Sequence, residues 1–84
     1  MRQTRMTPEK VYVAYFGQAY VLKADGFKQL CEDVLREGTY DGLELYGRAL
    51  SKERSCEIIG NDDAICLLNF NRDDARYYQY IYNF

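Results

Sequence analysis

Two runs of β-favouring residues, separated by Gly17-Gln18, make up residues 11–23. Because glycine first in a two-residue loop is typical of a type II′ turn, the pattern predicts a β-hairpin that pairs Phe16 with Ala19. The apolar side chains of one face are Val11, Val13, Tyr15, Tyr20 and Leu22, and those of the other are Tyr12, Ala14, Phe16, Ala19 and Val21. Both faces are therefore apolar, which is unusual for a sheet with one side in water.

The clearest helical pattern follows at residues 25–38. Its apolar side chains recur at intervals of three and four residues and form one stripe, which consists of Phe27, Leu30, Cys31, Val34 and Leu35. Asp25 lies where an N-terminal cap is expected, and Gly38 where a left-handed residue ends a helix. The pattern predicts an amphipathic helix.

The second half of the chain is predicted to form short strands. Residues 43–47 alternate as a strand does, and residues 48–54 form a charged loop. A second hairpin is expected from the apolar runs 55–59 and 64–70, which flank the turn at 60–63. This hairpin is again apolar on both faces.

Residues 72–84 fit two patterns. As a strand they place one aromatic set on a common face, namely Tyr78, Tyr80, Tyr82 and Phe84. As a helix they begin at a cap, Asn71 or Asp73, and the stripe consists of Tyr77, Tyr80, Ile81 and Phe84. The aromatic content favours the strand, and the helix is the alternative.

The predicted order of elements is β-β-α-β-β-β, with one further strand where residues 72–84 are extended. This order predicts an α+β fold, with a mostly antiparallel sheet and one amphipathic helix packed on one face. A ubiquitin-like roll is the alternative, since it also begins with a hairpin and a helix. Residues 10–84 are expected to form a single small domain after a flexible lead-in at residues 1–9.

Composition argues against catalysis. The 84 residues include nine tyrosines but no histidine, the side chain that most readily moves protons near neutral pH. Cys31, Cys56 and Cys66 lack the paired spacing of a zinc site, and no histidine is present as the base that would form a thiolate. We therefore expect these cysteines to act as small, buried hydrophobic side chains. Cys56 and Cys66 would point to opposite faces of the second hairpin, which excludes a disulfide between them. The sequence predicts a protein that is not an enzyme and holds no cofactor or metal ion.

The sequence also bears on location and on the class of partner. No stretch approaches the ~20 apolar residues of a membrane span, and the start of the chain lacks the apolar core of a secretory signal. We therefore expect a cytoplasmic protein without a membrane partner, located in the host cytoplasm if a phage encodes it. The net charge of −2 makes nucleic acid an unfavourable partner.

Surplus apolar surface is the strongest indication of function. One helix covers one face of a small sheet, so the second apolar face needs a cover: the Tyr-rich tail, another copy of the chain, or a different protein with a basic surface. The alternative is a strongly curled, barrel-like sheet that buries both faces. Tyrosines supply anchors and aspartates steer a basic partner. The residues expected to bind a partner are Tyr46, Asp62, Asp63, Asp73, Asp74, Tyr77, Tyr78, Tyr80 and Tyr82.

These features predict a non-enzymatic protein-binding module that occupies a surface of its partner. In size, acidity and lack of catalytic groups the chain resembles small inhibitors encoded by phages and mobile elements, anti-CRISPR proteins among them. The resemblance implies a stoichiometric inhibitor or adaptor that covers a basic surface of a nucleic-acid-binding partner.

Two other functions stay open. The first is single-stranded nucleic-acid binding, in which tyrosines stack on bases and cations contact phosphates. The residues for that platform are Arg48, Lys52, Arg54, Arg72 and Arg76 together with Tyr46, Tyr77 and Tyr78. The second is a structural subunit that homodimerises through the uncovered sheet face.

Overall fold

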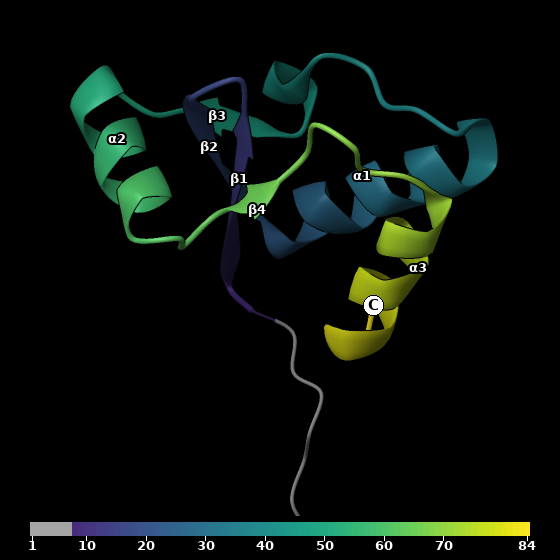
Figure 1. Ribbon diagram of the computed structural model, residues 1–84. Coiled ribbons are helices and arrows are strands. Elements are labelled where there is room, and N and C mark those ends of the chain that lie inside the picture. The colour runs from purple at the N-terminus through teal and green to yellow at the C-terminus, as the bar shows by residue number, and fades with distance from the viewer. Residues whose placement is uncertain (1–7) are drawn as a thin grey trace, which may run out of the picture.

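The computed structural model describes residues 8–84, so the predicted lead-in at residues 1–9 lies almost entirely outside the described residues. The described part contains strands β1 (Lys10–Tyr15), β2 (Gln18–Lys23), β3 (Gly47–Ala49) and β4 (Ile65–Cys66), and helices α1 (Ala24–Glu37), α2 (Lys52–Gly60) and α3 (Arg72–Ile81). A 3₁₀ turn, η1 (Leu43–Leu45), precedes β3 (Figure 1). The predicted α+β class is confirmed in one small domain.

The four strands form a mixed sheet in the order β3-β2-β1-β4. The β1–β2 and β2–β3 ladders are antiparallel, while β4 runs parallel to β1. Two of the three ladders therefore have the predicted orientation. The parallel ladder follows from the long connection between the first hairpin and β4, which brings the chain back along β1.

The first hairpin is confirmed, but its turn is displaced by one residue. The loop is Phe16-Gly17, and both residues have positive φ (50° and 78°), as in a type I′ turn. Ala19 pairs with Ala14 and not with Phe16. Because this moves the pairing by two positions, each side chain keeps the face that the sequence predicts.

Helix α1 confirms the predicted stripe, with Phe27, Leu30 and Val34 fully buried. It ends at Gly38, whose φ of 82° is left-handed and whose N–H donates to the Val34 carbonyl at 2.7 Å. The prediction of an Asp25 cap is wrong. Asp25 lies inside the first turn, where its charge complements the positive end of the helix.

Residues 43–66 fold differently from the prediction. The strand expected at 43–47 is largely η1, and β3 begins at its last residue, Gly47, and continues into the segment expected to be a charged loop. The strand expected at 55–59 belongs to α2, so the second hairpin is wrong. Only β4 remains of the strand expected at 64–70, and it pairs with β1.

Local capping explains why α2 is a helix. The Ser51 hydroxyl accepts a hydrogen bond from the Arg54 N–H at 3.1 Å, and the Arg54 guanidinium pairs with Glu57 at 2.7 Å. Lysine, arginine and glutamate in the first two turns are strong helix formers. Together these contributions outweigh the β preference of the Ile58-Ile59 pair.

The last element is the helix, so the preferred strand at 72–84 is wrong. Asn71 and Asp74 form a capping box: the Asn71 side chain accepts from the Asp74 N–H at 3.0 Å, and the Asp74 carboxylate accepts from the Asn71 N–H at 3.2 Å. The inward side of α3 begins at Ala75, which is fully buried. Tyr78 and Tyr82 follow on that side, packed against the core.

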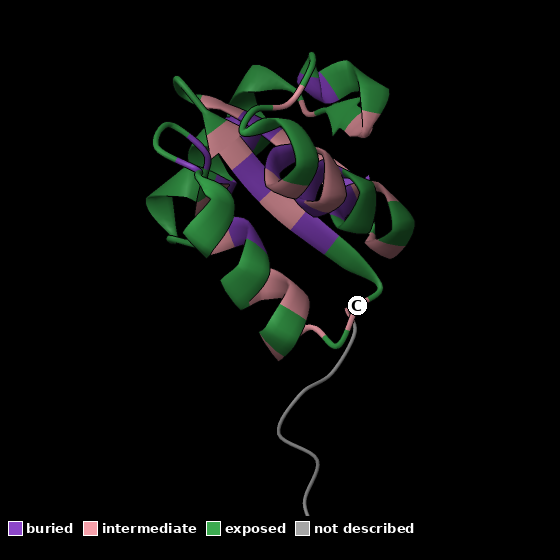
Figure 2. Cartoon of the chain, turned by 90° about the vertical axis from the view of Figure 1, so that its right-hand side faces the viewer, coloured by how far each residue is buried: buried purple, intermediate pink, exposed green. Residues whose placement is uncertain are grey.

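The helices lie on both sides of the sheet, so the prediction of one helix on one face is wrong. α1 covers one face and α3 packs against α1, whereas α2 lies on the opposite face, at the left in Figure 1. Figure 2 shows buried positions along the strands between these layers. Helix α2 buries Ser55 and Ile58 against the second face. Part of the apolar surface that the sequence left uncovered is thus covered by the chain itself.

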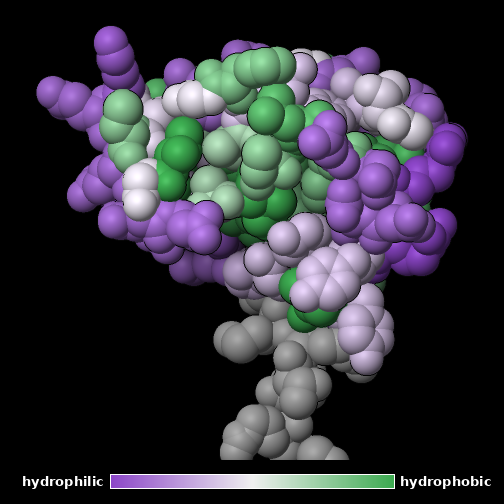
Figure 3. Space-filling view, in the orientation of Figure 1, coloured by the Kyte–Doolittle hydropathy of each residue, from purple (hydrophilic) through white to green (hydrophobic). Residues whose placement is uncertain are grey.

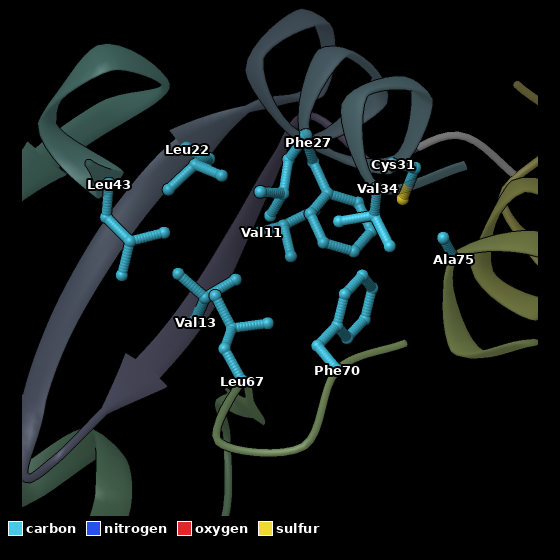
Figure 4. Close-up of a cluster of buried hydrophobic side chains, with 11 residues drawn as sticks. Val11, Val13, Leu22, Phe27, Cys31, Val34, Leu43, Leu67, Phe70 and Ala75 are labelled. Atoms are coloured by element: carbon cyan, nitrogen blue, oxygen red, sulfur yellow. The ribbon is translucent and has the colours of Figure 1, made fainter. Parts of the chain in front are cut away.

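The main core lies between α1 and the sheet (Figure 4). Phe27 is fully buried at its centre. Its ring lies 5.7 Å from the ring of Tyr78 and 6.1 Å from that of Phe84, with Phe70 and Tyr82 at similar distances. This aromatic cluster attaches α3 to α1.

Candidate functional site

The tyrosines of α3 and of its C-cap, Tyr82, divide into an inner and an outer pair. Tyr78 and Tyr82 pack on the core, and burial raises the pKa of both hydroxyls. Tyr77 and Tyr80 lie on the outer side, 57% and 64% exposed. The predicted helical stripe that contained Tyr77 and Tyr80 is therefore wrong, and two of the expected partner-binding tyrosines have a structural role.

Tyr46 also has a structural role. Its hydroxyl donates to the Asp33 carboxylate on α1 and accepts from the Asp41 N–H at 3.4 Å. Burial and the Asp33 carboxylate raise the pKa of Tyr46 to about 12. The hydrogen bond from Tyr46, followed by that from Gln29, lowers the pKa of Asp33. These contacts fasten the segment before β3 to α1.

The Tyr46→Phe variant is expected to have a lower melting temperature than wild type, because Asp33 loses its hydrogen-bond donor. The deprotonated Asp33 is favoured by folding, so its contribution is present above pH ~4 and is lost as the pH falls through the lowered pKa. The protonated Tyr46 is favoured by folding, so its contribution is present below pH ~10 and is lost as the pH rises toward 12. Thermal melts across pH check that the difference is largest between these limits. An equal difference at pH 2 and pH 7 would contradict the pairing.

The acidic pair Asp73-Asp74 begins α3. Asp74 belongs to the capping box, and Asp73 pairs with Arg76 at 3.2 Å. Both carboxylates lie near the positive end of the helix, where negative charge is favourable. The structure therefore gives these two predicted partner-binding residues a local role in helix formation.

An exposed apolar face lies where the first hairpin, the end of α2 and β4 meet. Its members surround a hollow of about 180 Å³ and are Ala14, Phe16, Ile59, Ala64, Cys66 and Leu68, with Gly17 and Asp62 completing the lining. We call this surface the apolar face. Figure 3 shows apolar side chains gathered over β4 and its surroundings. The apolar face lies on the α2 side of the sheet, in the part that α2 does not cover.

Phe16 combines high exposure with an unfavourable backbone conformation. Its side chain is 76% exposed, and its ring contacts Tyr15 edge-on at 4.6 Å between centroids. Its φ of 50° is left-handed, a conformation that suits glycine and asparagine and costs an ordinary side chain about 1–2 kcal/mol. A residue that weakens its turn and stays outside the core indicates a role beyond folding.

Negative charge borders the apolar face. Asp62 lines it, and Asp63 follows in the same turn, as the sequence predicts. Among residues 8–84 neither carboxylate takes part in an ion pair. No basic side chain belongs to the lining. Of the predicted partner-binding residues, Asp62 is the one that lines the apolar face, and Asp63 lies next to it in the chain.

The basic residues predicted to bind nucleic acid do not gather on one surface. The Arg72 guanidinium donates to the Leu35 carbonyl at the end of α1, at 3.0 Å, and Arg76 pairs with Asp73. Both arginines belong to α3, on the α1 side of the sheet, whereas Arg54 belongs to α2 on the other side. The predicted platform is not assembled.

The cysteines differ in environment. Cys31 is buried as predicted, and burial raises the pKa of its thiol to about 12. Cys56 and Cys66 are exposed, so the prediction of burial is wrong for both; it rested on the second hairpin, which does not form. Within the described part of the chain, no three metal-ligating side chains come together. No helix among residues 8–84 has both the length and the apolar character needed to cross a bilayer.

Comparison of the chain with protein-family models, curated proteins and solved structures found no match. Function is therefore inferred from the chemistry of the apolar face.

Proposed function

We propose that the protein is a non-catalytic protein-binding module that docks through the apolar face. Phe16 is the observation that carries this proposal, because it is exposed, aromatic and held in a left-handed conformation that is unfavourable for phenylalanine. Aromatic side chains on an apolar patch with a polar rim are typical anchors of protein interfaces. The hollow beside Phe16 accepts an apolar side chain of the partner.

The charge of the rim defines the chemistry of the partner. Asp62 and Asp63 favour a partner that surrounds its own apolar contact with lysine or arginine side chains, because complementary charge accelerates association and selects the partner. A stoichiometric inhibitor that covers a basic surface of a nucleic-acid-binding protein is the form of this proposal that the sequence predicts. The phage or mobile-element origin and the cytoplasmic location stay predictions.

Phe16→Ser and Leu45→Ser form a matched pair that tests the proposal. Each removes one apolar side chain of similar exposure, 76% for Phe16 and 73% for Leu45, and Leu45 lies outside the lining of the apolar face. We expect Phe16→Ser to weaken binding of the partner at least about thirtyfold, since interface anchors contribute 2 kcal/mol or more. Leu45→Ser is expected to bind as wild type does. Affinity purification with all three proteins, followed by titration of the partner retained, measures this.

The outcomes separate the candidate occupants of the face. A partner that is lost with Phe16→Ser and kept with Leu45→Ser supports the proposal. A partner that both variants retain equally contradicts it. Sedimentation at several concentrations distinguishes a second copy of the chain: self-association that disappears in Phe16→Ser would replace the proposed partner with a homodimer.

A further inference from the structure

A second hollow lies on the other side of Leu68, toward α1. It has a volume of about 570 Å³. We call it the tyrosine hollow, and its polar and aromatic lining consists of Tyr15, Tyr20, Thr39, Tyr40, Asp41, Glu44 and Phe70. Leu68 lines both this hollow and the apolar face, so the two surfaces are continuous around the β4 edge of the sheet.

The lining of the tyrosine hollow has one sign of charge. It contains two carboxylates, Asp41 and Glu44, and no lysine or arginine. Neither carboxylate forms an ion pair within residues 8–84. The lining of the hollow therefore carries negative charge and no cationic side chain of its own.

The tyrosines that line the hollow are held in place. The Tyr40 hydroxyl donates to the Leu67 carbonyl at 3.3 Å, and the Tyr40 ring meets that of Tyr15 edge-on at 6.5 Å between centroids. Burial, followed by the charge of Glu44 and a hydrogen bond with Glu44, raises the pKa of Tyr20. The rings are thus neutral and positioned by other contacts. Aromatic faces attract cations, and nearby carboxylates add charge attraction.

We propose that the tyrosine hollow binds a lysine or arginine side chain of the partner protein. The inference rests on the proposed function, since it names the group that a partner docked on the apolar face inserts next to it. The apolar face supplies contact area, and the tyrosine hollow selects for positive charge. A cationic side chain is attracted by two carboxylates that form no ion pair in the described part of the chain and by the tyrosine rings of the lining, whereas a neutral side chain of the same shape lacks this charge attraction.

Small cations test the tyrosine hollow without the partner. The probes are N-acetyl-arginine amide and N-acetyl-lysine amide, and the neutral controls are the corresponding amides of citrulline and Nε-acetyl-lysine. We expect saturable NMR shifts with the cationic probes at Tyr15, Tyr20, Tyr40 and their neighbours. Binding is expected to be at least about fivefold weaker in Glu44→Gln than in wild type. Asp73→Asn, which removes a carboxylate that lies outside the hollow, is expected to bind as wild type does.

The results decide between the two proposals. Equal binding of cationic and neutral probes, absence of saturable shifts, or equal binding by Glu44→Gln and wild type would each overturn the cation site. Phe16→Ser is expected to keep its affinity for the cationic probes, because Phe16 is not part of this lining. Cation binding in a protein whose partner does not depend on Phe16 would support the tyrosine hollow while contradicting the proposed function.

Discussion

Phe27→Ala is expected to lower the free energy of unfolding by about 3–5 kcal/mol, as is typical of phenylalanine removed from a packed core. Domains are commonly stable by only about 5–15 kcal/mol, so the variant should be close to unfolding. The reason is specific to this chain. Phe27 is fully buried on α1, and its ring contacts four others, among them those of Tyr78 on α3 and Tyr82 at its C-cap. Its loss leaves a cavity and detaches α3 from α1.

Phe16→Ala is the matched control for Phe27→Ala, since it makes the same chemical change at an exposed position. The left-handed conformation of residue 16 is about equally unfavourable for alanine and phenylalanine. Phe16→Ala should therefore lower the free energy of unfolding by less than about 1 kcal/mol. Urea unfolding followed by circular dichroism measures both variants. A Phe27→Ala protein as stable as Phe16→Ala would contradict the position of Phe27 at the centre of the core.

Local patterns were sufficient to predict the first hairpin and α1. The apolar stripe of α1 is continuous, and Gly38 marks its end, so the helix depends little on distant contacts. The predicted faces of the hairpin are correct although its predicted turn is wrong, because a displacement of two positions leaves each side chain on the same face of its strand. Phe16 in the first loop position gave no turn signal, since asparagine, aspartate or glycine is usual there.

The helices α2 and α3 could not be predicted from β propensity. Ile58-Ile59 and the tyrosines of residues 77–82 favour a strand, but Ser51 and Asn71 cap helices that begin upstream of them. The signal that was missed at α2 is the cap followed by strong helix formers. At α3 the capping box Asn71-Asp74 is such a signal, and it should have outweighed the aromatic content.

The candidate site was predicted only in part. Asp62 lines an exposed apolar face and Asp63 follows it in the turn, while their contact with a basic partner stays a prediction. The tyrosines gave no such guide, because their rings serve cores and interfaces equally well. The sequence pattern places Phe16 on the side of Ala14, where it lies, but its exposure depends on how far α2 extends over that side. That extent is a property of tertiary packing and not of local sequence.

Phe16→Asn separates the needs of folding from those of binding. Asparagine accepts a left-handed φ more readily than phenylalanine and is a usual residue at the first position of a type I′ turn. The gain in the turn offsets the lost edge contact with Tyr15. The free energy of unfolding is therefore expected to stay within about 1 kcal/mol of wild type or to rise. Affinity for the partner is expected to fall at least about thirtyfold, because the anchor is gone.

A loss of affinity without a loss of stability would exclude a merely structural reason for Phe16. If Phe16 were retained for stability, its replacement by asparagine would lower both the free energy of unfolding and the affinity for the partner. If Phe16 is retained for docking, its replacement lowers the affinity alone. The turn then contains a residue that is unfavourable for folding but needed by the interface. Urea unfolding and titration of the same protein sample with its partner provide the two numbers. Unchanged affinity in Phe16→Asn, with a folded and stable protein, would leave the conformation of this residue without a functional explanation.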